Sequence, residues 1–247
     1  MFELRILGVV DLKKRYGQEQ PELLKQRKYT ALLAYLAAET PRGFHARDRL
    51  VAMFWPELDQ EHARGALRKA VHEIRRALGP EVLPSRGDDE VGVDDYHLWC
   101  DASAFEEEYD RGKLVEAMKL YRGDLLAGFY VNDAPDFLDW LDRARTRLRD
   151  RASAAAWSLA QQEEHADHLT VAGGWGRRAA ELAPTDERML RRVLALLDRL
   201  GDRAGAVFVY DRFAKQLKRD YGVEPSVDTK ALVRQVRERG GSQPSDR

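Results

Sequence analysis

Basic side chains gather between Arg64 and Arg76, and their types and spacing are the strongest chemical signal in this 247-residue sequence. Five residues of that stretch are Arg or Lys, and its one acid is Glu73. At 100° per residue, the following side chains share one side of a helix: Arg68, Lys69, His72, Arg75 and Arg76. Such groups donate hydrogen bonds to base edges and phosphates, so this face suits double-stranded DNA.

The helix that would carry these cations has clear ends and an apolar side. Asp59 is a good N-cap, Glu61 lies in the first turn, and Gly79-Pro80 supply the stop. The side opposite the cations is apolar: Ala63, Leu67, Ala70, Val71, Ile74 and Leu78. Gly65, at the front of the outward face, would let DNA approach the helix backbone closely.

The elements around this helix predict a winged helix-turn-helix. Alternation at 2–6, the run VVDL, and residues 22–24 behind Pro21 predict three short strands. A helix from Arg27 and a short helix closed by Trp55-Pro56 follow. Behind the basic helix, EVLPS and EVGV flank a turn around Gly87 and predict a hairpin. In this fold the third helix enters the major groove and the hairpin reaches the flanking backbone.

Composition limits the partners and the location. The net charge is −1 with 34% charged residues, so a DNA-binding surface must be local and balanced by acid elsewhere. The single cysteine, Cys100, excludes an internal disulfide and is interpreted as a small apolar residue. The start lacks the features of a signal peptide, and the apolar stretches are too short for a bilayer. We therefore expect no membrane partner and a cytoplasmic, nucleoid-associated protein.

The second half reads as amphipathic helices without strands. Ala172 and Ala206, and likewise Ala179 and Phe213, lie 34 residues apart, which is the period of tetratricopeptide repeats. Gly176 stands where that repeat has an aromatic residue. The predicted fold class is mostly α with an α+β N-terminal part. We predict a winged-helix domain at 1–99, a tetratricopeptide-like all-α repeat domain at 100–239, and a disordered tail at 240–247.

Nothing in the sequence supplies an enzyme site. No histidine falls in an H-E-x-x-H pattern, and there is no cysteine cluster for a metal. The glycines at 173, 174 and 176 lack the Lys-Ser/Thr of a phosphate loop and are interpreted as a weakened spot in a helix. The aromatic residues at 125–140 are interpreted as core packing, with a partner-binding groove as the alternative. We predict no catalytic residue, no metal site and no cofactor.

Three longer segments add a family resemblance. The run from Leu50 to Gly79 resembles the winged-helix core of the Streptomyces antibiotic regulatory protein family. The segments LYRGDLLAGF, ELAPTDERMLRRVLALLDRLGDRAGAVFVYDRF and LKRDYGVEPS resemble the bacterial transcriptional activator domain that follows it there. The landmarks stand in family order over roughly residues 1 to 238.

This resemblance implies a fold and a function. It implies an OmpR-type, response-regulator-like winged helix followed by a tetratricopeptide-like domain. The implied function is sequence-specific promoter binding, usually at directly repeated sites in tandem. The implied partners are double-stranded DNA, RNA polymerase or a sigma factor, and a second copy of the chain on tandem sites.

Residue roles follow by position. The five cations of the basic helix face are expected to read DNA, with Arg64 as a flanking phosphate contact. Arg47, Arg27 and Lys28, at the starts of the two preceding helices, are expected at the DNA backbone. In the hairpin only Arg86 is basic, so it alone is expected to touch DNA, with Asp88, Asp89 and Glu90 sitting away from it.

One rival function stays open. A helical-repeat adaptor for protein partners, whose winged domain has no DNA affinity, also fits a net charge near zero. Binding to random duplex DNA separates the two, because binding through phosphates weakens steeply with salt.

Overall fold

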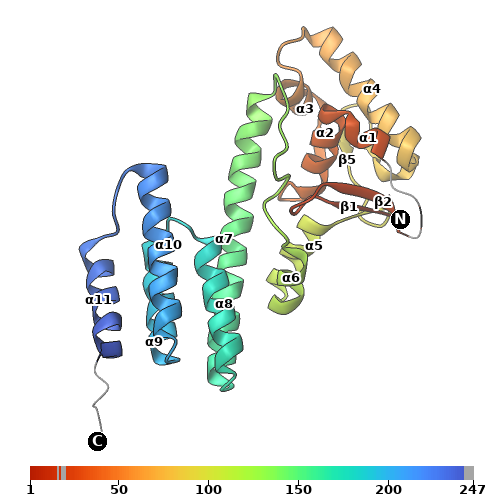
Figure 1. Cartoon of the computed structure of the whole chain (residues 1–247). Coiled ribbons are helices and arrows are strands. Elements are labelled where there is room, and N and C mark those ends of the chain that lie inside the picture. Colours follow the sequence, from red (N-terminus) through yellow and green to blue (C-terminus); the bar gives the residue numbers. More distant parts are fainter. Residues whose placement is uncertain (16, 18–20, 242–247) are drawn as a thin grey trace, which may run out of the picture. The chain divides into compact units, whose positions relative to one another are not determined.

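The computed structural model describes residues 1–15, 17 and 21–241. The chain divides into two compact units, Met1–Leu148 and Arg149–Arg247. Figure 1 labels the helices α1 to α11 and the strands β1, β2 and β5.

The first unit contains a small sheet built from both ends of the winged-helix segment. Its strands are β1 (Phe2–Arg5), β2 (Asp11–Lys14) and β6 (Leu98–Cys100), in the order β2-β1-β6. β1 runs antiparallel to β2 and parallel to β6, so Phe2 pairs with Leu98. Leu4, Leu12 and Leu98 are buried, because every second residue of these strands points into the core.

The third strand expected at 22–24 is wrong. Those residues belong to α1 (Pro21–Lys25), and Pro21 stands at its first position. Proline has no N–H to donate and its φ suits a first helical turn, so Pro21 favours a helix start here rather than a strand. The sheet takes its third strand from β6 instead, more than seventy residues further along the chain.

Three helices follow the sequence prediction closely. They are α2 (Arg27–Ala38), α3 (Arg47–Phe54) and α4 (Gln60–Leu78). Tyr35 of α2 and Phe54 of α3 are fully buried, with their rings 6.0 Å apart in an edge-to-face contact. The short helix therefore packs into the same core as the long one that precedes it.

The hairpin behind α4 belongs to a second sheet. η1 (Pro80–Val82) leads to β4 (Ser85–Arg86) and β5 (Glu90–Gly92), which pair antiparallel. Gly87 takes a φ of +59° in the turn, a conformation that glycine adopts without strain. β3 (Phe44–Ala46), which the sequence analysis missed, pairs with β5 and completes the order β3-β5-β4.

The first unit also includes helices beyond the winged-helix segment: α5 (Asp101–Asp110), α6 (Leu114–Leu120) and the start of α7 (Pro135–His165). The Asp101 carboxylate accepts hydrogen bonds from the backbone N–H of Ile6 and Leu7, at 2.8 and 3.1 Å. Trp140 of α7 is buried with its ring 4.9 Å from that of Tyr35. The aromatic segment thus contributes to the core, as expected.

The second unit is a set of helices: the rest of α7, α8 (Leu169–Leu182), α9 (Glu187–Arg199), α10 (Arg203–Tyr221) and α11 (Val227–Gly241). Contacts join α8 to α9, α9 to α10, and α11 to both α9 and α10. The repeat positions predicted to be equivalent are buried: Ala172, Ala179, Ala206 and Phe213. The tetratricopeptide-like repeat expectation is consistent with this packing.

Gly176 explains the departure from the repeat pattern. A Cβ on Gly176 would lie 2.8 Å from Leu196 Cδ2 of α9. The missing side chain therefore lets Leu196 occupy the space that an aromatic residue would take. The glycines that the sequence analysis interpreted as a weak spot lie within a continuous helix, and Gly176 serves this close contact.

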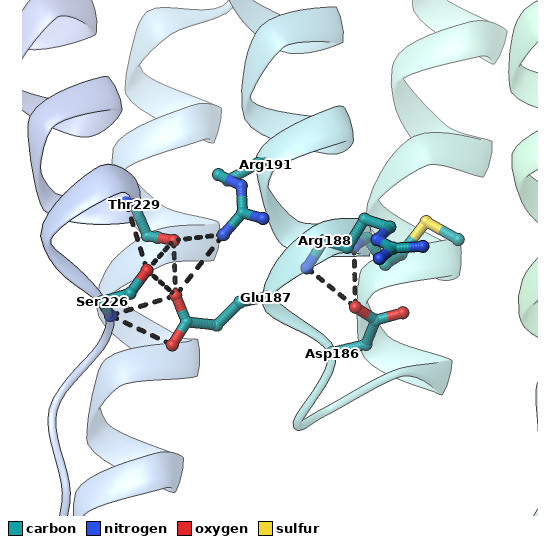
Figure 2. Close-up of polar contacts among 7 residues, drawn as sticks. Asp186, Glu187, Arg188, Arg191, Ser226 and Thr229 are labelled. Atoms are coloured by element: carbon teal, nitrogen blue, oxygen red, sulfur yellow. Dashed lines mark hydrogen bonds and ion pairs between the residues drawn. The ribbon is translucent and has the colours of Figure 1, made fainter.

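A polar cluster fixes the start of α11 against α9 (Figure 2). Glu187 accepts hydrogen bonds from the Ser226 backbone N–H at 3.0 Å and from the Thr229 hydroxyl at 2.5 Å. Arg191 approaches from the same helix and donates to Thr229 at 3.1 Å. Ser226 and Thr229 hold the pKa of the Glu187 carboxyl below its ordinary value, against the opposing effect of burial.

The fold class is confirmed as mostly α with an α+β N-terminal part. The boundary between residues 99 and 100 stays a prediction, since the first compact unit extends through α5 and α6 to Leu148. Of the predicted tail, 240–241 end α11 and 242–247 lie outside the described residues. No helix of the described chain is long and apolar enough to span a membrane.

Candidate nucleic-acid interface

α4 turns its cations outward because its apolar side is fully used by the core. Ala63, Leu67, Ala70 and Ile74 are at most 1% exposed. Asp59 caps the helix by accepting from the His62 backbone N–H at 3.0 Å, as expected from the sequence. A helix that packs against the core along one side presents its opposite side to solvent.

Three side chains on that outward face are free to bind a ligand. Arg68, Lys69 and His72 are exposed. Within the described ranges, no hydrogen bond or ion pair occupies any of these three side chains. A ligand would find their donors available, with no internal partner to displace.

Two other predicted cations carry surface ion pairs. Arg64 donates to the Asp48 carboxylate of α3 through Nε and Nη2, at 3.1 and 2.9 Å. Arg76 pairs with Glu73 one turn earlier on α4. The Arg64 and Arg76 side chains remain 50% and 71% exposed, and exposed pairs of this kind are weak. A polyanion can therefore compete for both.

Arg75 turns toward the hairpin and supports it. Its Nε donates to the Leu83 carbonyl at 3.0 Å, and its Nη2 donates to the Ser85 hydroxyl at 2.8 Å. Arg47 donates to the same hydroxyl at 3.0 Å, while its backbone N–H donates to the Asp89 carbonyl at 2.8 Å. These bonds fix β4 against the helices α3 and α4.

The Arg47 side chain is partly buried where it lines the space beside α4. Burial lowers the pKa of its guanidinium, and the nearby charge of Arg75 lowers it further. Its Nε is shielded from solvent and has no hydrogen-bond partner among the described residues.

A groove of about 780 Å³ brings the predicted residues of α3, α4 and the hairpin together. Its charged and polar lining comes from all three elements: Arg47, Asp48, Arg64, Arg68, Arg75, Ser85 and Asp88. Asp89 lines it as well, so these acids stand beside the cations. Their placement away from DNA stays a prediction.

The remaining predicted residues are engaged elsewhere. Arg86 lies 4.2 Å from the centre of the Phe44 ring and 3.5 Å from the Glu90 carboxylate. Lys28 pairs with Glu57 at 2.7 Å. Arg27 donates to the Tyr130 carbonyl at 2.9 Å and lies over the Phe129 ring. Arg27, Lys28 and Arg86 line no part of the groove beside α4.

Sequence reasoning missed Ser85 and Asp48 as part of this surface. Ser85 lies within the predicted hairpin and Asp48 in the predicted short helix, but nothing local distinguishes them from other surface polar residues. His45 was missed as an interior residue, and burial lowers its pKa. In the described ranges no three His, Cys, Asp or Glu side chains gather as metal ligands would.

These features define a winged-helix unit with an outward basic helix, followed by a helical-repeat unit. The sequence profile of the bacterial transcriptional activator domain matches residues 100–237, more than half of the chain. The chain therefore belongs to that family, and it is a transcriptional regulator of the Streptomyces antibiotic regulatory protein type.

The fold is similar to a solved structure of Mycobacterium tuberculosis EmbR in complex with a low affinity phosphopeptide. The match has a TM-score of 0.63 and 20% identity, and it covers 99% of this chain. It covers 66% of the EmbR chain, so this chain spans less than two thirds of that length. No curated protein sequence matches this chain.

Proposed function

We propose that this regulator binds promoter DNA through α4, and that its helical repeats make the protein contacts that activate transcription. The observation that carries the proposal is the outward face of α4. There Arg68, Lys69 and His72 are exposed and form no hydrogen bond or ion pair with the described residues. A major groove admits one α-helix, and these side chains supply the donors that read guanine and contact phosphates.

The groove beside α4 supports the same function. Arg47 and Arg64 lie there next to Arg68, so a phosphate following the edge of the major groove would meet several donors. Arg75 holds the hairpin and adds positive charge without needing to reach a base. We assign base reading to Lys69, His72 and Arg76, and phosphate contact to Arg47, Arg64 and Arg68.

The net charge of −1 is compatible with a local DNA-binding surface, because the exposed ends of Arg68, Lys69 and His72 on α4 have no acidic partner among the described residues. Asp88 and Asp89 at the groove rim would repel misplaced phosphates and so help to set the register of the duplex. Binding directly repeated sites side by side, and contact with RNA polymerase or a sigma factor, complete the proposed activity. The proposed role needs no catalytic step and places the protein on the nucleoid.

Fluorescence anisotropy of the full chain on random duplex DNA tests the proposal against the adaptor alternative. We expect binding that weakens steeply between about 50 and 200 mM salt, because each neutralised phosphate releases counterion. The triple variant R68A/K69A/H72A should lose most of that binding and flatten the salt dependence. The control variant K119A removes an exposed lysine of α6 and should change little.

Two outcomes would favour the adaptor instead. One is no binding by the natural chain even at the lowest salt. The other is equal binding by the triple variant, since the DNA-binding surface would then lie elsewhere. For tandem binding, a gel shift on two directly repeated copies of a selected site should give two successive complexes, and one copy should give one.

A further inference from the structure

A second pocket, of about 1220 Å³, lies wholly within the first unit and has no part in the proposed DNA surface. Residues 7–11 between β1 and β2, the junction of α1 and α2, and the loop at 122–129 surround it. Backbone hydrogen bonds hold that loop against the residues that follow β1: Gly8 N–H to the Asp124 carbonyl at 3.0 Å and Leu126 N–H to the Ile6 carbonyl at 2.7 Å. The walls are thus anchored to the sheet.

Bare backbone forms one side of this pocket. Gly8 has a φ of +93°, which disfavours any other residue there. A Cβ on Gly123 would lie 3.1 Å from the Gly8 Cα, closer than ordinary contacts allow. The two glycines therefore bring the loop and the strand end together and leave this side of the pocket without side chains.

The lining of the pocket has more basic than acidic residues, although the whole chain has a net charge of −1. Four basic side chains line the pocket: Arg5, Lys25, Arg27 and Arg122. Arg5 pairs with Glu3 at 3.4 Å and Lys25 pairs with Glu22 at 2.5 Å, so Arg27 and Arg122 are the two cations without an acidic partner among the described residues. The two acids of the pocket are Asp11 and Asp101, and the Asp101 carboxylate is already occupied by the Ile6 and Leu7 N–H groups. Positive charge gathered around a concave surface attracts an anion.

Two of these cations have donors to spare. Arg122 is exposed, and nothing else in the described chain forms a hydrogen bond or ion pair with its side chain. Arg5 pairs with Glu3 through Nη2, while its Nε is shielded from solvent and lacks a hydrogen-bond partner among the described residues. A buried donor without a partner is costly, and an anion oxygen would satisfy it.

The pocket also has an apolar side. Phe129 and Leu24 line it, and the Arg27 guanidinium lies 5.8 Å from the Phe129 ring centre. Val9 also lines the pocket and is 84% exposed, so its side chain is accessible to a ligand there. A ligand that matches both sides needs an anionic group and an apolar body.

We propose that this pocket binds a small organic anion, a phosphate or carboxylate joined to an aromatic or aliphatic body. Arg122 and Arg5 hold the anionic group, and Phe129 and Val9 contact the apolar part. This site gives Arg27 a role other than the DNA contact expected from the sequence. The proposal does not rest on DNA binding and can be tested without DNA.

The test is titration of the full-length, ¹⁵N-labelled protein with phenyl phosphate, followed by amide chemical shifts. We expect saturable shifts concentrated at the amides of Gly8, Gly123 and Gly128. The variant R122Q should weaken binding at least about fivefold, because it removes a charge-assisted contact. The matched control R143Q, an exposed arginine of α7 in the same unit, should leave the affinity unchanged.

Other ligands separate the two halves of the proposal. Benzoate is expected to bind at the same amides, while phenol and inorganic phosphate should each bind at least about fivefold more weakly than phenyl phosphate. If phenol bound as tightly as phenyl phosphate, the pocket would not recognise the anionic group. If inorganic phosphate bound as tightly as phenyl phosphate, the pocket would not recognise the apolar body. Absence of saturable shifts with both organic anions, or shifts confined to α4, would overturn the site itself.

Discussion

The Arg75 guanidinium on α4 donates a 2.8 Å hydrogen bond to the Ser85 hydroxyl on β4. Arg47 donates to the same oxygen from α3, so one hydroxyl joins both helices to the hairpin. The hairpin is thereby positioned by the residues that flank the basic face. Substitution of Ser85 therefore tests how much DNA binding depends on the position of the hairpin beside α4.

Replacing Ser85 with Ala should weaken DNA binding without changing its salt dependence. The variant removes an acceptor but no charge, so the number of neutralised phosphates stays the same. We expect about 1 kcal/mol less free energy of unfolding, from one lost hydrogen-bonding group. Denaturant unfolding and anisotropy at several salt concentrations measure the two effects, and S85T should restore both. A shallower salt dependence in S85A would contradict the prediction.

Replacing Lys69 or Arg76 with Ala tests which side chains read bases. Each change should cost about 1–3 kcal/mol at a duplex that the protein selects from a random pool, if the side chain reaches a base edge. The loss should be smaller on random duplex, where no base is matched. K119A serves as the control for loss of an exposed charge. Unchanged affinity in both variants would show that Lys69 and Arg76 do not read bases and that another surface contacts the DNA.

Replacing Gly65 with Ala should have opposite effects on the stability of α4 and on DNA binding. A Cβ there meets only Arg68 Nη2, at 4.0 Å, so G65A should stabilise the unit by up to about 1 kcal/mol. If the DNA backbone approaches α4 at this point, the same methyl group should weaken DNA binding. G174A provides the matched control, since it adds a methyl group to open space in α8. Equal or tighter DNA binding by G65A would exclude close approach at residue 65.

Glu187 should make the second unit more stable at neutral pH than in acid. Its folded-state pKa lies below the ordinary value of 4.5, so protons bind the unfolded chain more readily. The contribution of Glu187 to the free energy of unfolding is complete above about pH 4.5. This contribution is lost as the pH falls through the lower pKa that Glu187 has in the folded state. Urea unfolding at pH 7 and near pH 4 should show this loss in the natural chain.

The variant E187Q should remove that part of the pH dependence and weaken the packing of α11, because the amide cannot accept all the hydrogen bonds shown in Figure 2. E238Q, on the exposed side of α11, is the matched control. If E187Q and the natural chain lost equal stability on acidification, other carboxyl groups would have to account for the dependence.

Cys100 should resist alkylation in the folded protein. It is 5% exposed, and burial raises the pKa of its thiol to about 12, so almost no thiolate forms at pH 8. Mass spectrometry after iodoacetamide treatment should find an unmodified chain without denaturant and complete modification in denaturant. Rapid labelling of the native protein would mean that β6 opens readily.

The sequence alone determined the features that depend on neighbours along the chain. The basic helix could be predicted with its cap at Asp59, its stop at Gly79 and its apolar side, because helical periodicity and capping act within a few residues. The repeat spacing likewise identified buried positions such as Ala172 and Ala206. Family resemblance gave the order of the two kinds of domain.

Only the tertiary structure decided what depends on distant segments. β6 pairs with β1 across most of the winged-helix segment, and no local pattern specifies a partner so far away. Arg27, Arg75 and Arg86 all look like surface cations in sequence, yet each turns toward a different neighbour. A long side chain points toward a hydrogen-bond acceptor or an aromatic ring that lies within its reach. Which of these groups lie nearby is determined only by the folded arrangement of distant segments.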